Sequence, residues 1–298
     1  MKLTINAGHI NDRLGYSEFF DLMSNAGFDS VDFMLNDLVA DESEMLKTDT
    51  VEYCEKIKSE ANSRGLTIEQ THAPFTFKHW DDEEHFENVI FPRTVRALEM
   101  SALMGAKISV VHPLHHRIYK GNEEEMFNMN MNFYRRLIPY CREYGIKVGI
   151  ENMWQVDKLR KCIIQDTCNR ADELIRYIDT LDSEYMVACL DLGHVGLPEV
   201  SDEVHDFIRA LGHDRLKALH VHDNDYRNDS HALPFLGLMD WDEITQALAD
   251  INYDGDLTYE VSKSILNTRF SGYSPIAAKF MADVGRHLIS EIERKKTK

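Results

Sequence analysis

Short apolar runs recur along the chain and alternate with longer stretches in which apolar residues return every three or four positions. The short runs are apolar almost throughout, as expected of parallel strands buried on both faces, and the longer stretches have the period of amphipathic helices. The pattern predicts strands at residues 3–7, 30–34, 67–71, 107–111, 147–150, 186–190, 216–222 and 257–261. It predicts helices at residues 16–26, 43–64, 84–104, 123–144, 171–180, 201–211, 241–250 and 276–293. Eight strand–helix pairs in alternation indicate an α/β chain folded as a (β/α)8 TIM barrel with an eight-stranded parallel core.

The joints between helices and strands support this arrangement. Gly27, Gly65, Gly105 and Gly145 each follow a predicted helix and precede a predicted strand. Glycine ends helices because it enters the left-handed region without a Cβ clash. Asn169 is expected to cap the helix that begins near residue 171, since the next residues form an acidic first turn.

Length and composition favour one domain covering residues 1–298. A chain of 298 residues with 43% hydrophobic and 28% charged residues suits a barrel with a large core. Apolar runs stay well below the ~18 residues that span a bilayer, and no signal-peptide pattern begins the chain, so we expect a cytoplasmic protein. The long connections 76–83, 114–122, 153–169 and 223–240 all follow strands. They would therefore lie at the C-terminal mouth, where barrel enzymes place their active sites.

The charge and the cysteines restrict the partners. A net charge of −18 disfavours nucleic acid and anionic membranes as ligands, because both are bound through lysine and arginine. The five cysteines form no CxxC pair, which argues against a disulfide framework. Cys54, Cys141 and Cys189 are expected in the core, whereas Cys162 and Cys168 flank a loop and are expected at the surface.

Residues that commonly bind metals stand at the ends of six predicted strands, about 30 to 40 residues apart, the length of one strand–helix unit. They are His72, His112, Glu151, Asp191, His220 and Glu260. Because all strand ends of a parallel barrel meet at one mouth, the spacing predicts that these six side chains converge there.

The last four positions predict the main metal site and the catalytic pair. Glu151, Asp191, His220 and Glu260 offer three carboxylates and one imidazole, a set that suits Mn²⁺, Mg²⁺, Co²⁺ or Zn²⁺. A divalent ion would stabilise the enediolate formed when a C–H next to a carbonyl is deprotonated. Glu151 and Glu260 are the candidates for the acid/base pair that moves this proton. His222 lies on the same strand face as His220, and we favour His220 as the ligand.

Six further residues are predicted to bind substrate or additional metal ions. Two end earlier strands and four lie at or beyond the ends of later strands: His72, His112, His194, His222, Asp229 and His231. Phe75, Trp80, Trp154 and Phe235 are candidates for the pocket wall.

The motifs THAPF, VVHP, GIENM, CLDLGHVG, LHVHDND, DSH, MDW and TYEV occur in this order along the chain. In that order and spacing the chain resembles the xylose isomerase-like TIM-barrel superfamily, which includes sugar phosphate isomerases, ketose 3-epimerases, inositol-pathway enzymes and endonuclease IV. Resemblance to the ketose 3-epimerases implies one divalent metal on Glu151, Asp191, His220 or His222, and Glu260, with both glutamates exchanging the proton. Those epimerases carry an arginine after the strand-seven histidine, and Arg227 matches that position only loosely.

Resemblance to endonuclease IV implies a different site. Its three zinc ions have nine ligands, and each has a match in this chain: His72, His112, Glu151, Asp191, His194, His220, Asp229, His231 and Glu260. The acidic surface argues against a DNA substrate. We therefore predict a metal-dependent isomerase or epimerase acting on a sugar, sugar phosphate or polyol. The alternatives are a trinuclear-zinc phosphodiesterase, an inosose dehydratase-like lyase and a sugar-binding barrel without catalysis. A homo-oligomer is left open.

Overall fold

The computed structural model describes residues 1–8, 14–75, 82–114, 118–198, 202–261 and 272–297. The strands are β1 (Leu3–Asn6), β2 (Ser30–Met34), β3 (Thr67–His72), β4 (Ile108–Val110), β5 (Lys147–Glu151), β6 (Trp154–Asp157), β7 (Cys162–Gln165), β8 (Met186–Asp191), β9 (Leu216–His220) and β10 (Leu257–Tyr259). The helices are α2 (Tyr16–Ala26), α3 (Glu44–Lys47), α4 (Thr50–Asn62), α5 (Glu83–His85), α6 (Phe91–Met104), α7 (Glu123–Tyr144), α8 (Ala171–Leu181), α9 (Leu192–Val195), α10 (Val204–Arg215), α11 (Trp241–Asp250) and α12 (Tyr273–Lys296), with a 3₁₀ turn at Asn36–Val39 and a π-helical turn at Phe86–Ile90.

Eight strands form one parallel sheet in the order β10, β1, β2, β3, β4, β5, β8 and β9. Val221, directly after β9, pairs in parallel with Tyr259 of β10 and brings the two edges of the sheet together. The Val221 amide donates to the Thr258 carbonyl at 2.8 Å, and the Glu260 amide donates to the Val221 carbonyl at 3.2 Å. The sheet is therefore a nearly closed barrel, and the predicted (β/α)8 TIM barrel is confirmed.

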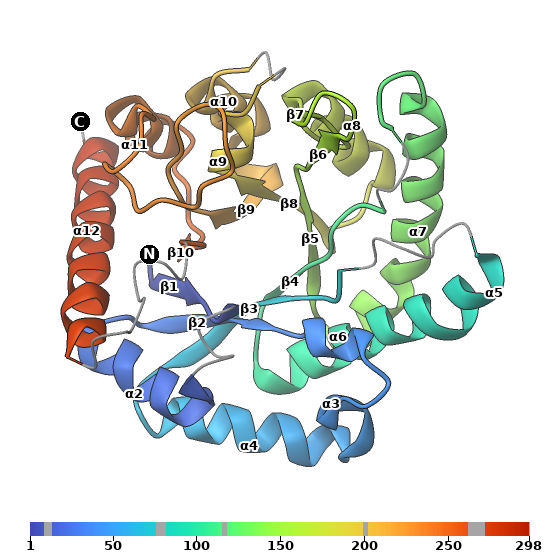
Figure 1. Cartoon of the computed structure of the whole chain (residues 1–298), viewed down its shortest axis with the longest axis horizontal. Helices are drawn as coiled ribbons and strands as arrows, with labels where there is room; N and C mark the ends of the chain where they lie inside the picture. Colours follow the sequence, from blue (N-terminus) through green and yellow to red (C-terminus); the bar gives the residue numbers. More distant parts are fainter. Residues whose placement is uncertain (9–13, 76–81, 115–117, 199–201, 262–271, 298) are drawn as a thin grey trace.

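Helices surround this barrel (Figure 1), with α12 against α2 and α11, and α4 against α6. The longer helices bury an apolar stripe; in α2 this stripe includes the buried Phe19, Phe20 and Met23. Most of the apolar core lies between the strands and the helices. A smaller buried group consists of Val110 on β4, Cys189 on β8 and Ala218 on β9. The barrel is thus packed, and its polar residues concentrate toward the strand ends.

Most of the predicted elements are found, and three helices have the predicted bounds: α2, α7 and α11. Gly145 shows why the end of α7 could be predicted from the sequence, since this residue has φ 68° in the left-handed region that glycine favours. The predicted helix 43–64 is divided into α3 and α4, and the predicted helix 84–104 begins with the short α5 and a π-helical turn. These breaks are local and leave the order of strands unchanged.

The connection 153–169 differs from the sequence prediction. It contains an antiparallel hairpin in which β6 pairs with β7 from Trp154 opposite Gln165 to Asp157 opposite Cys162. Beyond it the chain turns inward, so Cys168 is fully buried with φ 63°, and the expectation of a surface thiol is wrong. Asn169 does not cap α8: its amide donates to the Met153 carbonyl at 3.2 Å and ties the two ends of the hairpin segment together.

Among the described residues, no helix combines the length and apolar character that a bilayer span requires. Parts of the predicted loops 76–83 and 114–122 lie outside the described residues, as does the predicted pocket residue Trp80.

Candidate metal centre and active site

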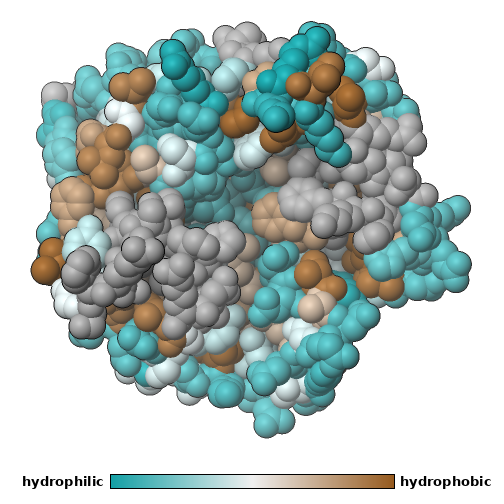
Figure 2. Space-filling view, viewed as in Figure 1, coloured by the Kyte–Doolittle hydropathy of each residue, from teal (hydrophilic) through white to brown (hydrophobic). Residues whose placement is uncertain are grey.

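The six residues predicted at strand ends converge at one end of the barrel. The residues His72, Glu151, Asp191 and His220 end β3, β5, β8 and β9. Glu260 directly follows β10, and His112 lies two residues beyond the end of β4. Figure 2 shows that the surface is hollowed near the centre of the ring and that hydrophilic residues cover much of the visible wall. The spacing argument from the sequence therefore placed these side chains at a common site.

The four residues predicted as the main metal site do lie together. Glu151, Asp191, His220 and Glu260 each offer a ligand atom within 4.8 Å of the others. His220 Nδ1 lies 3.1 Å from Glu151 Oε1, 3.5 Å from Glu260 Oε2 and 3.9 Å from Asp191 Oδ2. We call these four the glutamate group. The Glu260 side chain is 22% exposed, whereas the Glu151 side chain is 2% exposed, so Glu260 is the more accessible carboxylate.

His72 and His112 form a second group with Glu151. His112 Nε2 lies 2.7 Å from Glu151 Oε2, and His72 Nε2 lies 3.8 Å from Glu260 Oε1. His72 Nδ1 faces Asp32 of β2, at 2.8 Å from Oδ2. Asp32 therefore holds the His72 ring so that its other nitrogen points toward the glutamate group, an arrangement that is typical of metal-binding histidines.

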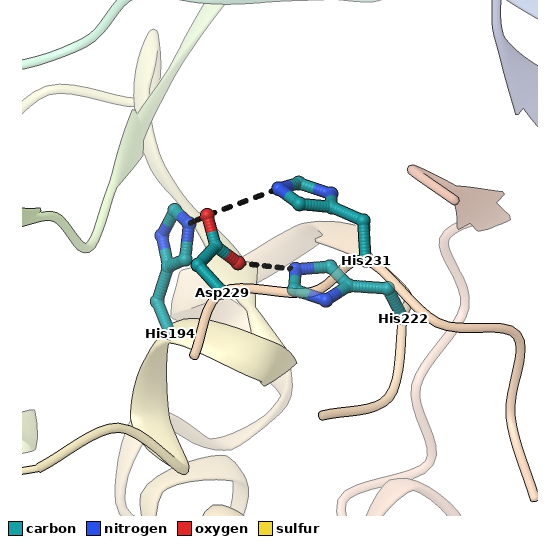
Figure 3. A group of neighbouring side chains, drawn as sticks. All are labelled: His194, His222, Asp229 and His231. Atoms are coloured by element: carbon teal, nitrogen blue, oxygen red, sulfur yellow. Dashed lines mark hydrogen bonds and ion pairs between the residues drawn. The ribbon is translucent and has the colours of Figure 1, made fainter. Parts of the chain in front are cut away.

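A third group lies beside the glutamate group and consists of His194, His222, Asp229 and His231 (Figure 3). His231 Nε2 lies 3.0 Å from Asp229 Oδ2, and His194 Nε2 lies 3.7 Å from the same oxygen. His222 Nε2 lies 3.8 Å from Asp229 Oδ1. We call these four residues the histidine group, and it contains all the remaining predicted site residues.

The structure separates His220 from His222. Both are fully buried and share a strand face, but only His220 belongs to the glutamate group. Two residues along a strand correspond to a rise of roughly 6.6 Å. His222 therefore lies further toward the loops, with its Nε2 2.8 Å from Asp191 Oδ1 and 3.8 Å from Asp229 Oδ1. The preference for His220 as the ligand stays a prediction.

The carboxylates of both groups are balanced by imidazoles. Burial raises the pKa of Asp191, but His194 and His222 lower it more, to about 2. Burial likewise raises the pKa of Glu151, and His220 and His112 outweigh it, so this pKa falls well below its ordinary value. No lysine or arginine of the described residues forms an ion pair with these carboxylates. The site is therefore a concentration of negative charge neutralised only by groups that also bind metals.

Buried polar atoms without hydrogen-bond partners show whether a cation fits here. Within the described residues these atoms include His72 Nε2, His220 Nδ1, His222 Nδ1, Glu151 Oε2 and Asp229 Oδ1. Such atoms are rare in folded proteins, because each unpaired group costs desolvation free energy. Imidazole nitrogens and carboxylate oxygens that face one another within 4.8 Å are the donor set that Zn²⁺, Mn²⁺ and Co²⁺ take. The residues present therefore fit a divalent cation.

Some residues that support the site escaped the sequence prediction. Asp32 reads as an ordinary strand residue, and Gln70, whose Nε2 lies 3.1 Å from His220 Nε2, lies inside the barrel. The Asn152 carbonyl accepts from His194 Nδ1 at 2.8 Å. Asp223 is fully buried and accepts hydrogen bonds from the Phe235 and Met239 amides and the Trp241 indole, which fixes the base of the loop after β9. Of these supporting residues, only Asn152 and Asp223 directly follow a predicted site residue in the sequence. That adjacency was the one signal in the sequence that could have indicated their role.

The candidate wall residues divide into two kinds. The Phe75 ring centroid lies 4.0 Å from that of His112, and the Trp154 indole donates to Asp229 at 3.1 Å, so both border the site. Phe235 is 52% exposed and its ring packs near Trp241 and His287 instead. Arg227 is exposed on the loop after β9.

The chain belongs to the xylose isomerase-like TIM barrel family, whose family model matches residues 20–278. It is 23% identical over 256 residues to a D-psicose 3-epimerase of Enterocloster bolteae, covering 82% of this chain and 76% of that protein. It is 29% identical over 157 residues to a mannonate dehydratase of Enterococcus faecalis, covering 50% of this chain and 42% of that protein.

Solved structures share the fold. A D-psicose 3-epimerase of Clostridium cellulolyticum H10 with D-tagatose has a TM-score of 0.75 and 17% identity, covering 97% of this chain and 99% of that chain. The IolI protein with a bound zinc atom has a TM-score of 0.69 and 17% identity, covering 99% of both chains. These likenesses establish the barrel architecture, and the neighbours are sugar epimerases and related proteins.

Proposed function

We propose that this protein is a divalent-metal-dependent isomerase or epimerase that acts on a small sugar, sugar phosphate or polyol. The observation that carries the proposal is the glutamate group, in which two glutamates, an aspartate and a histidine meet within 4.8 Å at the barrel mouth. Glu151, Asp191, His220 and Glu260 would hold the cation. When bound, the cation would polarise a substrate carbonyl and acidify the neighbouring C–H bond.

The two glutamates have the roles of proton acceptor and donor in this proposal. Glu151 is buried and ionised, since His220 and His112 hold its pKa well below the ordinary value. Glu260 is the more exposed of the two, so its carboxylate can reach a substrate in the hollow. Proton removal by one carboxylate and return by the other would invert or move a stereocentre. The D-psicose 3-epimerase relative supports this reaction class.

Solvent deuterium provides the test. Purified protein with Mn²⁺ or Co²⁺ is incubated in D2O with a panel of ketoses, polyols and their phosphates, and deuterium on the substrate carbon is measured by mass spectrometry. We expect incorporation with at least one member, and its loss in Glu151→Gln and in Glu260→Gln. Absence of exchange across the panel, with metal bound, would contradict an isomerase or epimerase.

The matched control for these variants is Glu69→Gln, which makes the same substitution away from the mouth. Glu69 pairs with Lys2 and Lys107, which directly precede β1 and β4. The Glu69→Gln variant should retain deuterium exchange. This result would distinguish the loss of a carboxylate at the site from a general effect of the substitution on the fold.

A second candidate is favoured by one observation, namely that two further groups adjoin the glutamate group. Three adjoining metal positions would suit a trinuclear phosphodiesterase of the endonuclease IV type. The net charge of −18 opposes a DNA substrate. Metal analysis together with cleavage of an abasic oligonucleotide distinguishes the two: cleavage with three zinc ions bound would establish the phosphodiesterase. The mannonate dehydratase relative supports a lyase as a further alternative. A dehydrated product formed from a member of the ketose and polyol panel would identify a lyase.

A further inference from the structure

Exposed apolar side chains gather on two segments of the chain, the first half of α12 and a turn in the loop after β9. They are Phe235, Leu236 and Leu238 in the loop and Tyr273, Ile276 and Phe280 in α12, each between 43% and 68% exposed. Half of the large hydrophobic side chains that are exposed in the described part of the chain belong to these two segments. The ring centroid of Phe235 lies 6.1 Å from that of His287 of α12, so the segments adjoin. We call these six residues the apolar face, and Figure 2 shows apolar residues gathered at the left of the view, over α12.

The α12 part of the apolar face has the spacing of a helix that packs against another helix. Tyr273, Ile276 and Phe280 are spaced i, i+3 and i+7, so they share one side of α12. A different side of the helix, which includes Ala278 and Met281, is buried in the core. The helix therefore keeps an exposed apolar stripe after it has packed within its own barrel, which is typical of an interaction surface.

The loop part of the apolar face has a strained backbone. The Leu236 amide donates to the Leu233 carbonyl at 3.0 Å and closes a turn in which Phe235 has φ 72°. Turns with a positive φ at this position normally place glycine or asparagine there, because a bulky side chain is strained. Such strain is common where a residue serves a function other than folding. The turn thus holds an aromatic ring half in solvent, in a conformation that glycine adopts more readily.

The buried Asp223 carboxylate fixes this turn. Its Oδ2 accepts hydrogen bonds from the Phe235 amide at 3.0 Å and from the Trp241 indole at 2.8 Å, and its Oδ1 accepts from the Met239 amide at 3.1 Å. Gly237 lies so close that an added Cβ would come within 2.2 Å of Asp223 Oδ1. A surface that is already ordered loses little conformational entropy when a partner binds. The exposed side chains of the turn are therefore presented in a form that is ready for contact.

Charge also distinguishes this side of the molecule. Helix α12 contains five lysine or arginine residues and three acidic residues, in a chain with a net charge of −18. Two copies of so acidic a chain repel each other, and this repulsion is weaker where helices of positive net charge meet. Lys279 and Asp283 form an ion pair on the exposed side of α12. In two such helices packed antiparallel about an axis next to Phe280, Lys279 of each copy would face Asp283 of the other.

The area of the apolar face suits a dimer. A large aromatic side chain carries about 150–250 Å² of surface, so six large side chains that are about half to two-thirds exposed present on the order of 600 Å². The largest apolar patch of a typical monomer is about 300–600 Å². A two-fold axis uses the same surface on both copies. The apolar side chains alone would therefore bury on the order of 1,200 Å², where specific interfaces begin.

We propose that the apolar face is the interface of a homodimer. Helix α12 packs antiparallel against α12 of a second copy, with the two-fold axis next to Phe280. This axis places the Phe235 turn of each copy against the beginning of α12 in the other, because His287 and Tyr273 lie equally far from Phe280 along the helix. The apolar side chains of the two segments then cover one another.

Analytical ultracentrifugation of the full chain over a range of concentrations tests the dimer. We expect the wild type to form a dimer whose population rises with concentration. Phe280→Glu and Leu236→Glu each place a carboxylate in one segment and should weaken the dimer by roughly 30-fold or more, as for a central interface residue. Both side chains are exposed, so circular dichroism should show a retained fold. A wild type that stays monomeric, or a dimer of unchanged affinity in both variants, would overturn the interface.

Leu159→Glu is the matched control. Leu159 is 86% exposed between β6 and β7, away from the apolar face, and the substitution adds the same charge. The dimer should keep its affinity in this variant. Equal weakening by Leu159→Glu would show that added negative charge by itself separates the copies, and the assignment to the apolar face would be wrong.

Phe235→Asn separates an interface role from a role within the chain. Asparagine tolerates a positive φ, so the urea midpoint of the monomer should not fall, whereas the dimer should weaken about tenfold or more. A lower midpoint with an unchanged dimer would show that the ring serves only its contacts with Trp241 and His287, and the turn would not belong to the interface.

Sedimentation with phosphatidylglycerol vesicles tests the other surface that an apolar and basic helix can meet. The wild type should remain in the supernatant as a dimer. A monomer that binds the vesicles, and loses this binding in Phe280→Glu, would overturn the dimer in favour of lipid contact. The dimer is independent of the proposed reaction, since failure of deuterium exchange leaves it standing and a monomer leaves the proposed isomerase or epimerase standing.

Discussion

Glu69 of β3 and Glu151 of β5 are both largely buried carboxylates, and their partners differ. Glu69 lies toward the amino ends of the strands and pairs with Lys2 and with Lys107, the latter at 2.8 Å. Burial raises its pKa, but the hydrogen bonds from Lys107 and Lys2 lower it to about 2. Glu151, at the opposite end of its strand, faces His112 and His220.

The difference between the two sites shows how the partners of a buried glutamate determine whether it contributes to stability or is available to bind a metal ion. A lysine stays charged at neutral pH, so it neutralises a carboxylate permanently and contributes to stability. An imidazole can lose its proton and become a metal ligand, so the Glu151 environment can exchange protons for a cation. The two ends of the barrel therefore differ in the residues that pair with the buried glutamate. At the amino ends of the strands, called the supporting end, these are lysines, and at the mouth, which is proposed to be reactive, they are histidines.

The largest expected effect tests the reactive end. Glu151→Gln should reduce deuterium exchange by about 10²–10⁴-fold, the range for removal of a general acid or base. The free energy of unfolding without metal should fall as well, because the lowered pKa of Glu151 means that the folded state favours its ionised form, which glutamine lacks, and because His220 and His112 lose their carboxylate partner. Denaturant unfolding and exchange are measured side by side. A variant that keeps its exchange rate would remove the contrast with Glu69.

A third buried carboxylate, Glu173, sharpens the comparison, because its hydrogen bonds come from neither a lysine nor an imidazole. Burial raises its pKa to about 7, against a smaller lowering by the Tyr119 hydroxyl and the Cys168 amide. The folded state therefore keeps a proton that the unfolded state loses between pH 4.5 and 7, so stability falls as pH rises through this window.

Glu173→Gln should remove that loss. The variant should match the wild type near pH 4 and exceed it above pH 7 by on the order of 3 kcal/mol. Urea unfolding at several pH values is the measurement. A constant difference across the pH range would show that Glu173 does not titrate in this window.

The next effect concerns the orientation of His72. Asp32→Asn weakens the hold on His72 Nδ1, which lies 2.8 Å from Asp32 Oδ2. Loss of such a partner lowers metal affinity by roughly 10–100-fold, and titration with Zn²⁺ or Co²⁺ would show it. The same affinity in both proteins would mean that His72 contributes no ligand.

The smallest effect belongs to the supporting end. Glu69→Gln weakens pairs with Lys2 and Lys107, whose side chains are 40% and 75% exposed. Exposed partners limit the loss to about 1 kcal/mol of unfolding free energy. Exchange activity should remain at the wild-type level. A large loss of exchange would show that the two ends of the barrel are coupled.

The order of elements was predictable from the sequence because it depends on local signals. In α7 an acidic first turn and Gly145 mark both ends, and the helix runs from Glu123 to Tyr144 as predicted. The hairpin of β6 and β7 was missed because each strand has only four residues and lies half-buried or exposed, outside the regular alternation of strands and helices. The burial of Cys168 was missed for a related reason, since it depends on a turn with φ 63°.

The convergence of the candidate site residues could also be predicted from the sequence alone. Parallel strands of a barrel must end at one mouth, so the regular spacing of His72, His112, Glu151, Asp191, His220 and Glu260 was sufficient to bring them together. Their roles as ligands and acid/base groups remain proposals.

Only the tertiary structure decided how these residues are grouped. The distance between neighbouring strands and the rise of about 3.3 Å per residue along each strand place His220 beside Glu151 and His222 beside Asp229. Asp32 acquired a role because β2 lies next to β3 and its side chain faces His72. Such neighbours are far apart in the sequence, and no local pattern encodes which of them meet.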